Sequence, residues 1–298
     1  MCGIAGLFIK DPTLQPQLGE LLAKMTSTLC SRGPDSAGFA IYGAGEEGKS
    51  KLTIAGPSEA FIRNVAERLV AAIDPKASSA VRLSHAVITL KPDDVARAIE
   101  WLSANFPETG VVSEGQRLEI YKEVGYPDDV AKAFGIATMS GTHGISHTRM
   151  ATESAVTTNG AHPFSTGADQ CLVHNGSLSN HASLRRELTR EGAKIRTEND
   201  SEVAAGYLTH RMRQGQTLGQ ALKSSLDDLD GFFTFVVGTE SGFGVLRDPI
   251  ACKPAVMAET DRYVAFSSEY KSLTCLPDIK SARVWEPKPA TVYFWEHV

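Results

Sequence analysis

The sequence predicts an α+β fold in which two β-sheets pack face to face and helices cover their outer surfaces. The first observation is a strand-like run of small and apolar residues at the start of the chain, Gly3–Phe8. The second is a tail of closely spaced strand-like segments, and the third is a set of amphipathic helical patterns between them. With 298 residues, 42% of them hydrophobic, the chain can form one large domain or two modest ones around a buried core.

Composition narrows the classes of function. The net charge is −5 and Lys and Arg form no runs, so nothing favours nucleic acid or an anionic membrane as a partner. No apolar run approaches ~18 residues, and the N-terminus lacks the pattern of a secretory signal. The five cysteines include no C-x-x-C pair, which argues against a zinc site or an iron–sulfur cluster in this chain. We therefore expect a cytoplasmic protein without a cofactor or metal of its own.

The first half of the chain predicts a strand, a helix, a turn and then a separate segment. Leucines at helical spacing predict a helix over 15–30, and a turn with two charged residues follows at 31–38. Residues 50–135 have few groups suited to catalysis, and we interpret them as a small α/β insert that is structural or faces a partner. Within this insert we expect helices at 59–73, 92–104 and 128–134, strands at 51–55 and 82–90, and a hairpin over 111–121.

The second half concentrates polar, chemically capable residues. A strand with polar alternation is predicted over 141–152, and the strand 170–174 is expected to close in a turn at Asn175-Gly176. Helices follow at 180–188, 200–212 and 218–229. The β-rich tail is predicted to contain strands at 232–238, 244–247, 255–258, 263–266, 282–285 and 291–295, with a short helix near 269–276.

Cys2 is the first candidate for chemistry. If Met1 is removed, Cys2 carries a thiol and a free α-amine on one residue. The thiol is a strong nucleophile, and an amine of pKa ~7.7–8.0 can move a proton near neutral pH. The residues alone leave two interpretations open, an N-terminal nucleophile or a cysteine packed in a first strand.

Other residues could complete an acyl-transfer site around Cys2. Asn175 and Gly176 could donate to an oxyanion, while Arg149 and Asp200 could hold the carboxylate and the ammonium group of an α-amino acid. The alternatives are a simple turn and a structural ion pair. His143, His147, His162 and His174 also allow a metal site, which we consider less favourable because it needs convergent geometry.

These motifs, in this order, resemble the class II glutamine amidotransferases of the N-terminal-nucleophile hydrolase superfamily. The matching segments are Cys2-Gly3-Ile4, Arg32-Gly33-Pro34-Asp35-Ser36, His147–Thr152, Asn159–Phe164, Val173–Gly176, Asn199–Glu202, Gly231–Phe233, Arg247–Pro249 with Lys253-Pro254, and Ser268-Glu269. The resemblance covers nearly the whole chain apart from the insert. It implies a four-layer αββα sandwich over residues 1–298, with the insert at about 50–135.

The resemblance also implies an activity and roles for residues. Glutamine would be hydrolysed to glutamate, and the ammonia would be delivered to a second active site. Cys2 matches the nucleophile, and Asn175 and Gly176 match the oxyanion hole. The expected substrate-binding residues are Arg149 for the α-carboxylate, Asp200 for the α-amine, Arg32 in a mobile loop near the nucleophile, and Thr152 and His162. Glu153 departs from the family pattern, in which histidine or a neutral residue is common.

The chain stops where an amidotransferase domain stops, so we expect the ammonia acceptor on another polypeptide. The runs 147–161 and 172–181 look most like the small subunit of split glutamate-synthase-like enzymes, among them N-methylglutamate synthase (methylamine–glutamate N-methyltransferase). This resemblance implies a hetero-oligomer with a flavin-binding synthase-like subunit and a β-helical glutamate-synthase-like subunit. Any FMN or iron–sulfur cluster would then belong to those partners.

Two alternative functions stay open at this stage. The chain could be a catalytically silent subunit that routes ammonia or methylamine within the same complex. It could also be another N-terminal hydrolase, such as an acylase, although the Arg149 and Asp200 pair disfavours that reading because an acylase substrate needs no free α-amino acid head.

Overall fold

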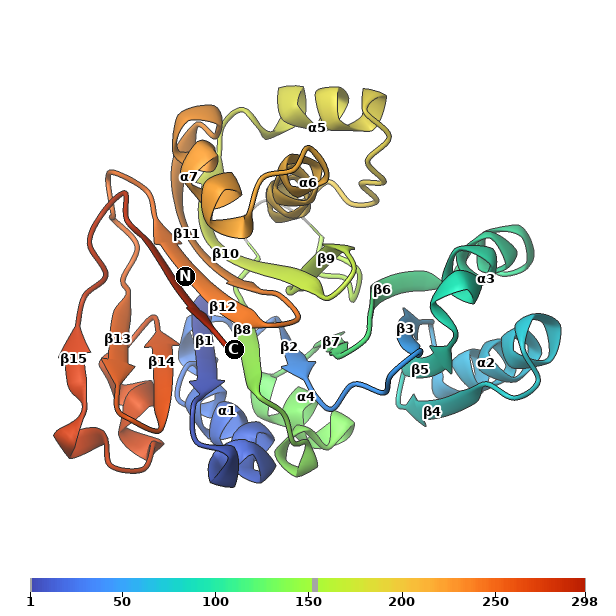
Figure 1. The fold of residues 1–298 in the computed structure, drawn as a ribbon, viewed down its shortest axis with the longest axis horizontal. Helices are drawn as coiled ribbons and strands as arrows, with labels where there is room; N and C mark the ends of the chain where they lie inside the picture. The colour runs from blue at the N-terminus through green and yellow to red at the C-terminus, as the bar shows by residue number, and fades with distance from the viewer. Residues whose placement is uncertain (1, 152–154, 298) are drawn as a thin grey trace.

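The computed structural model describes residues 2–151 and 155–297. Two antiparallel sheets form the main body (Figure 1). The first sheet has seven strands in the order β15 (Arg283–Trp285), β13 (Val256–Glu259), β14 (Tyr263–Ser267), β1 (Gly3–Ile9), β8 (His143–Arg149), β2 (Ser36–Tyr42) and β7 (Leu118–Val124). The second has five, in the order β16 (Val292–Glu296), β12 (Gly242–Arg247), β11 (Gly231–Gly238), β10 (Gln170–Leu178) and β9 (Phe164–Gly167).

Helices cover the outer face of each sheet, so the body has four layers. The seven-stranded sheet is covered by α1 (Leu18–Ser27) and α4 (Pro127–Phe134). The five-stranded sheet is covered by α5 (His181–Arg190), α6 (Asp200–Arg213) and α7 (Leu218–Asp228). Short 3-10 turns complete the layers at η1 (Pro12–Gln17), η2 (Cys30–Arg32), η3 (Ile136–Thr138), η4 (Tyr270–Cys275) and η5 (Ile279–Ser281). The predicted αββα sandwich is confirmed.

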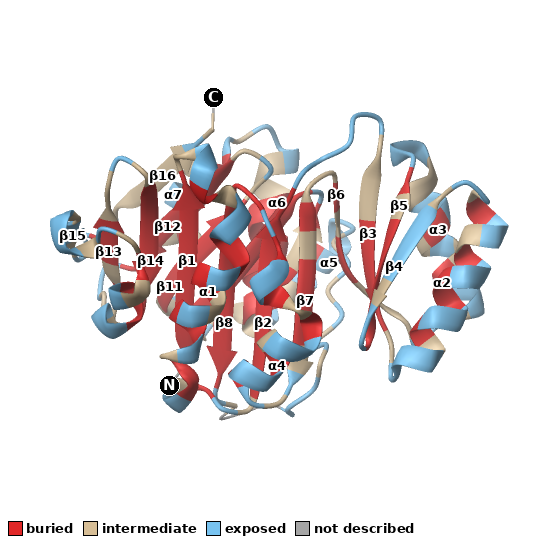
Figure 2. Cartoon of the chain, turned by 90° about the horizontal axis from the view of Figure 1, so that it is seen from below, coloured by how far each residue is buried: buried red, intermediate tan, exposed pale blue. Residues whose placement is uncertain are grey.

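Strand β1 shows why the chain folds this way. All seven of its residues are buried, because it is a central strand with a core on each face. Leu7 and Ile9 pack in the core beneath α1, whereas Ile4 and Phe8 pack in the core between the sheets. Figure 2 shows the central strands of the main body as almost continuously buried, while the helices expose one side. Burial of the N-terminal strand on both faces fixes the position of the residue that precedes it.

The insert forms its own sheet beside the sandwich (Figure 1). Its strand order is β4 (Ser78–Arg82), β5 (His85–Leu90), β3 (Ser50–Ala55) and β6 (Gly110–Gly115), and α2 (Glu59–Ile73) and α3 (Pro92–Asn105) supply its separate core. This sheet ends at Gly115, not near 135, because β7 pairs with β2 and α4 packs on the main body.

The predicted hairpin over 111–121 is wrong for the same reason. Strand β6 pairs with β3, whereas β7 pairs with β2, so the link between them passes from one sheet to another. The Asp169 carboxylate holds this crossing by accepting hydrogen bonds from the backbone N–H groups of Gln116, Arg117 and Leu118 at 2.6, 2.8 and 2.8 Å. A carboxylate far away in the sequence therefore stabilises this link, which the sequence alone suggests is a local turn.

Across the described ranges, no helix combines the length and the apolar character that crossing a membrane requires.

The spacing of the two sheets predicts a large effect of Gly6→Ala. A Cβ at Gly6 would lie 2.5 Å from Cε2 of Phe243, whose ring fills the space between the sheets. Overpacking of this kind costs about 1–3 kcal/mol, so we expect Gly6→Ala to lower the free energy of unfolding by that amount. Urea denaturation measures it. The control is Gly219→Ala in α7, where a Cβ meets nothing within 4 Å. This control should stabilise the protein by roughly 0.5–1 kcal/mol, and equal effects of the two substitutions would contradict the packing argument.

Buried histidines predict a steep loss of stability in acid. Burial lowers the pKa of His85, His143 and His147 to about 3, and it lowers the pKa of His162 well below its usual range. The unfolded chain, with histidine pKa near ~6.5, therefore binds more protons than the folded chain between pH ~6.5 and ~3, so stability falls as pH falls through this window. Each proton contributes ~1.4 kcal/mol per pH unit, which gives roughly 5–6 kcal/mol per unit for these four histidines.

Urea unfolding at a series of pH values between 4 and 7 measures this slope. The substitution His210→Gln on α6, outside the buried set, is the control and should leave the slope unchanged. A free energy of unfolding that stays constant from pH 6 to pH 4 would show that the buried rings are not neutral.

Candidate active site

Three segments that lie far apart in the sequence meet at Cys2. The backbone carbonyl of Cys2 accepts hydrogen bonds from Nε of Arg32 at 3.0 Å and from Nδ2 of Asn175 at 3.3 Å. The Cys2 thiol is half-buried, and its Sγ lies 4.0 Å from the carbonyl oxygen of Met150 at the end of β8. The residue thus sits where the seven-stranded sheet meets β10 of the five-stranded sheet.

Ser268 and Glu269 hold this end of the molecule together. Ser268 pairs with Ile4 in both directions, since its Oγ accepts from the Ile4 N–H at 3.0 Å and its own N–H donates to the Ile4 carbonyl at 3.0 Å. The Glu269 carboxylate accepts from Nη1 of Arg32 at 2.7 Å. Burial alone would raise the pKa of Glu269, but hydrogen bonds from Arg32 and Lys271 outweigh it and lower the pKa. Glu269 therefore orients the side chain that holds the Cys2 carbonyl.

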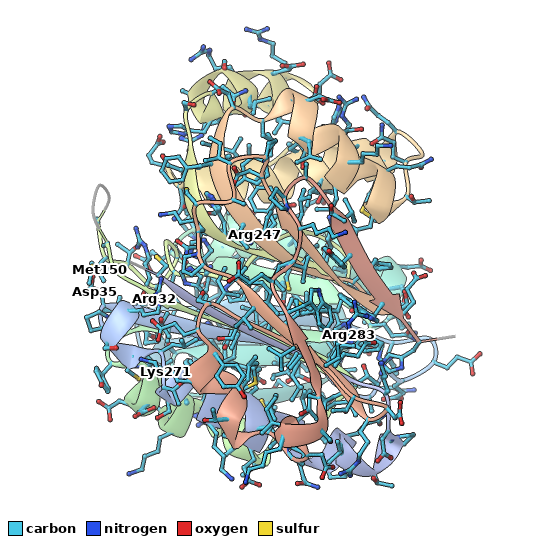
Figure 3. The ribbon with its side chains drawn as sticks, turned by 90° about the vertical axis from the view of Figure 1, so that its left-hand side faces the viewer. Arg32, Asp35, Met150, Arg247, Lys271 and Arg283 are labelled. Carbon is cyan, nitrogen blue, oxygen red and sulfur yellow. The ribbon has the colours of Figure 1, made fainter. Side chains whose placement is uncertain are left out.

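The turn that carries Arg32 is tied to strand β8. Gly33 lies directly against it, because a Cβ at Gly33 would be 2.4 Å from the carbonyl carbon of Thr148 and 2.5 Å from the Arg149 nitrogen. Asp35 donates its N–H to the Arg149 carbonyl at 3.1 Å and accepts the Ala151 N–H on its carboxylate at 2.8 Å. Figure 3 shows Arg32, Asp35 and Met150 together at one edge of the molecule. Glycine at position 33 is what permits this close approach.

Asn175 and Gly176 do not form the predicted turn. Strand β10 continues through them to Leu178, with Asn175 opposite Thr234 and Gly176 opposite Phe233 of β11. A Cβ at Gly176 would lie 2.0 Å from the Phe232 carbonyl oxygen and 2.6 Å from Nε2 of His174, so the position requires glycine. The side chain of Asn175 points to Cys2, and its amide is available as a donor beside the thiol-bearing residue.

Arg149 and Asp200 lie on either side of the loop 159–163. Arg149 is buried, and its Nη1 donates to the Ala155 carbonyl at 3.3 Å and approaches Gly160. Asn199, which caps α6 immediately before Asp200, donates from Nδ2 to the Gly160 carbonyl at 3.3 Å. Gly160 thus lies between Arg149 and Asn199, the residue that precedes Asp200.

Asp200 is held as a carboxylate. It accepts from the Leu178 N–H at 3.0 Å and from the Ser201 hydroxyl at 3.2 Å, and one oxygen lies 3.7 Å from Nδ1 of His174. Burial alone would raise its pKa, but hydrogen bonding and charge attraction from His174, together with the other two donors, lower the pKa to about 2. An ionised carboxylate at this position can bind an ammonium group at any pH near neutrality.

The remaining predicted residues differ in what surrounds them. His162 is buried, its ring stacks on His147 with centroids 3.9 Å apart, and it meets Phe164 edge-on at 4.9 Å. This packing supports the loop that contains His162, and direct contact with a substrate stays a prediction. Thr152 and Glu153 lie outside the described residues.

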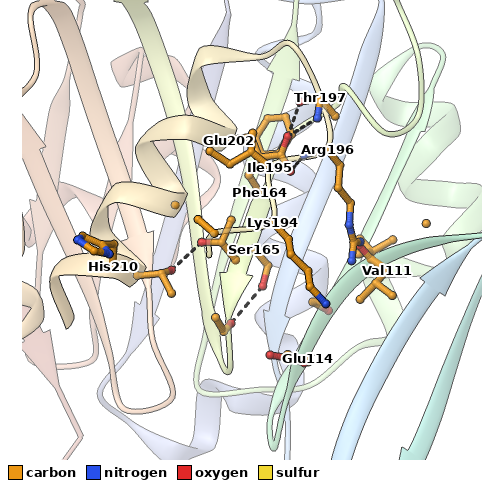
Figure 4. Close-up of a pocket in the computed structure, with 18 of the residues that line it drawn as sticks. Val111, Glu114, Phe164, Ser165, Lys194, Ile195, Arg196, Thr197, Glu202 and His210 are labelled. Atoms are coloured by element: carbon orange, nitrogen blue, oxygen red, sulfur yellow. Dashed lines mark hydrogen bonds between the residues drawn. The ribbon is translucent and has the colours of Figure 1, made fainter. Parts of the chain in front are cut away.

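A cavity of about 600 Å³ lies beside the site rather than at Cys2 (Figure 4). Strand β6 of the insert, β9, α6 and residues 191–197 form its walls, and Asn159 lines it on the side nearest the loop 159–163. Its charged lining is mixed, with Lys194 and Arg196 near Glu114 and Glu202. Within residues 2–151 and 155–297, no three His, Cys, Asp or Glu side chains are placed to hold a metal ion.

Sequence reasoning assigned no role to Ser268, Glu269 or Lys122. Ser268 and Glu269 fall in a matching motif, which is the signal that could have drawn attention to them. Lys122 resembles any polar residue of an alternating strand, and its contacts with the loop 159–163 are visible only in three dimensions.

Comparisons with known proteins identify relatives of this chain. The family described as the glutamine amidotransferase domain matches residues 147–275. The glutamine amidotransferase-like protein GlxB of Rhizobium meliloti (strain 1021) is 62% identical over 297 residues, which cover 100% of this chain and 99% of that protein. A protein of Methanothermobacter thermautotrophicus, whose name marks it as a provisional glutamine amidotransferase, is 34% identical over 98% of this chain and 99% of its own.

A solved structure shows the same fold. Glutamine phosphoribosylpyrophosphate amidotransferase of B. subtilis has a TM-score of 0.63 at 18% identity, over 99% of this chain and 47% of that one. The present chain thus spans about half the length of that enzyme. The two relatives that align along nearly their whole length, and the shared fold, lead to one conclusion: this chain belongs to the class II glutamine amidotransferase family.

Proposed function

We propose that this chain is a glutaminase, with Cys2 as the nucleophile after removal of Met1. The observation that carries the proposal is the double hydrogen bond from Arg32 and Asn175 to the Cys2 carbonyl. It fixes the thiol-bearing residue between the two sheets, beside an amide donor and near the pair Arg149 and Asp200. The two donors come from the turn η2 and from strand β10, so Cys2 is held from both halves of the sandwich.

The proposed reaction uses groups of this chain alone. The Cys2 α-amine takes the thiol proton, directly or through a water, and the thiolate attacks the side-chain amide carbon of glutamine. Asn175 Nδ2 and the Gly176 N–H stabilise the tetrahedral oxyanion. One such donor is typically worth ~10²–10³ in rate. The amine returns a proton to the leaving nitrogen, which departs as ammonia, and water then hydrolyses the γ-glutamyl thioester to glutamate and the free thiol.

The same arrangement supports selection of an α-amino acid. Arg149 can hold the α-carboxylate through its planar guanidinium, and Asp200 can hold the α-ammonium group. Arg32 closes the site from the side of Glu269. Thr152 and His162 are further candidates for substrate contact.

We place this glutaminase in a multi-subunit, glutamate-synthase-like enzyme of the cytoplasm, and N-methylglutamate synthase is the member that we favour. The sequence resemblance of residues 147–161 and 172–181 supports this assignment. The ammonia acceptor would then lie on a flavin-binding synthase-like partner, assembled with a β-helical subunit. FMN, and an iron–sulfur cluster where one is present, would be held by those partners.

Substitution of the nucleophile tests the activity. We expect Cys2→Ala and Cys2→Ser to lower glutaminase activity of the assembled complex by at least ~10³-fold, because both remove the thiolate that forms the thioester. Cys252→Ala, at an exposed cysteine away from the site, should leave activity unchanged. Intact mass of the purified protein should show loss of one methionine. Retained Met1, or full activity of Cys2→Ala, would instead support a silent subunit that routes ammonia or methylamine.

Glu269→Gln tests the support of Arg32. The substitution keeps the size of the side chain but removes the charge that binds the Arg32 guanidinium at 2.7 Å. We expect kcat/KM for glutamine to fall roughly tenfold, which corresponds to about 1.4 kcal/mol of transition-state stabilisation. The matched control is Glu259→Gln, which breaks a similar ion pair with Lys10 in a different part of the fold. If the two variants have identical kinetics, Glu269 has no role in supporting the site.

A further inference from the structure

Lys122 is a buried lysine whose amine is bound entirely to one loop. It lies on β7, and its side chain passes between the sheet and the loop 159–163. The Nζ atom donates to the carbonyls of Ala161, Asn159 and Pro163 at 2.8, 3.2 and 3.3 Å. These three contacts use all three N–H groups of an ammonium. The charge also lies 4.6 Å from the centroid of the Phe164 ring.

The loop and the amine depend on each other. Ala161 and Pro163 are buried, so without Lys122 their carbonyls would lose a donor that water cannot easily replace. In turn, burial lowers the pKa of Lys122 to about 7, while the Glu202 carboxylate opposes this effect. A lysine in such a place needs the loop carbonyls to solvate it. The interaction therefore fixes the loop in one position.

The other side of this loop contacts Arg149 and Asn199, which directly precedes Asp200 in the chain. Gly160 lies against Nη1 of Arg149, and its carbonyl accepts from Asn199, the N-cap of the helix that begins at Asp200. Any shift of the loop would change the position of Gly160 between Arg149 and Asp200. The separation of those two groups decides whether one α-amino acid can reach both.

We propose that Lys122 is a positioning residue for substrate recognition. It holds the loop 159–163 in place and so sets the distance between Arg149 and Asp200. The inference rests on the proposed function of that site. Lys122 thereby favours a substrate that has both an α-carboxylate and an α-ammonium group, although it does not contact the substrate itself.

Lys122→Met tests this inference, since it keeps the length of the side chain and removes the three donors. We expect the KM for L-glutamine to rise ~10-fold while kcat changes by less than about threefold. The preference for L-glutamine over glutaramate, which has the same amide and carboxylate but no α-amino group, should fall ~10-fold. A general loss of stability would not change this ratio.

The matched control is Lys51→Met. Lys51 is another mostly buried lysine that reaches β7, where it binds Glu119 at 2.7 Å. It should leave the KM and the substrate preference within about twofold of the parent. If Lys122→Met does not fold, as judged by circular dichroism and thermal unfolding, Lys122→Gln gives the same comparison with a shorter, polar side chain. A folded Lys122 variant with the preference of the parent overturns the proposal.

Binding separates this proposal from the proposed function. In the Cys2→Ala background, calorimetry measures the affinities for L-glutamine and glutaramate without turnover. If the parent chain binds glutamine but does not hydrolyse it, the glutaminase proposal fails, and the effect of Lys122→Met on the two affinities still decides the role of Lys122. If Lys122→Met leaves the ratio of affinities unchanged there, the positioning role is wrong although the glutaminase proposal stands.

Discussion

The hydrogen bonds that hold the Cys2 carbonyl are the constraint on which the rest of the site depends. Arg32 approaches from a turn attached to the seven-stranded sheet, and Asn175 approaches from the five-stranded sheet. The two donors can reach one carbonyl only while the sheets keep their native spacing. The packing of the core between the sheets therefore also determines the geometry around Cys2. Small residues between the sheets, such as Gly6 against Phe243, set the spacing that brings Asn175 to Cys2.

Sequence patterns predicted the elements whose signals are local. Helix α2 was expected at 59–73 and is found at Glu59–Ile73, because Ser58 caps it and its apolar positions recur at helical spacing. The errors occur where a distant partner decides the structure. Asn175-Gly176 has the composition of a turn, but pairing with β11 along the whole strand overrides that preference. The link after Gly115 likewise depends on Asp169, some fifty residues downstream.

In the candidate site, too, the sequence predicted some features and missed those that depend on distant contacts. The motif order predicted that Cys2, Arg32, Asn175, Arg149 and Asp200 belong to one site, and the structure brings them to one region. It could not indicate that Glu269 binds Arg32 or that Lys122 binds the loop 159–163, because contacts between segments far apart in the chain have no characteristic spacing in the sequence. His162 shows a related limit, since a motif identifies a residue without saying whether its ring faces the substrate or packs on His147.

The positions of Asp200 and Arg149 in the fold explain how their two charges are stabilised. Asp200 is the first residue of α6, where the backbone N–H groups and the helix dipole favour negative charge, and the Leu178 N–H adds a donor from β10. A carboxylate stabilised in this way stays ionised, so it can bind an ammonium group without a change in protonation. Arg149 is held at the end of β8 by the backbone contacts of Asp35 and the approach of Gly33. One group of the pair is fixed by a helix terminus and the other by a strand end, and the loop 159–163 lies against Arg149 and binds Asn199 next to Asp200. Under the proposed function, a substrate with both charges binds only when this loop keeps Arg149 and Asp200 at a suitable separation, and the proposal therefore makes the loop and Lys122 part of substrate recognition.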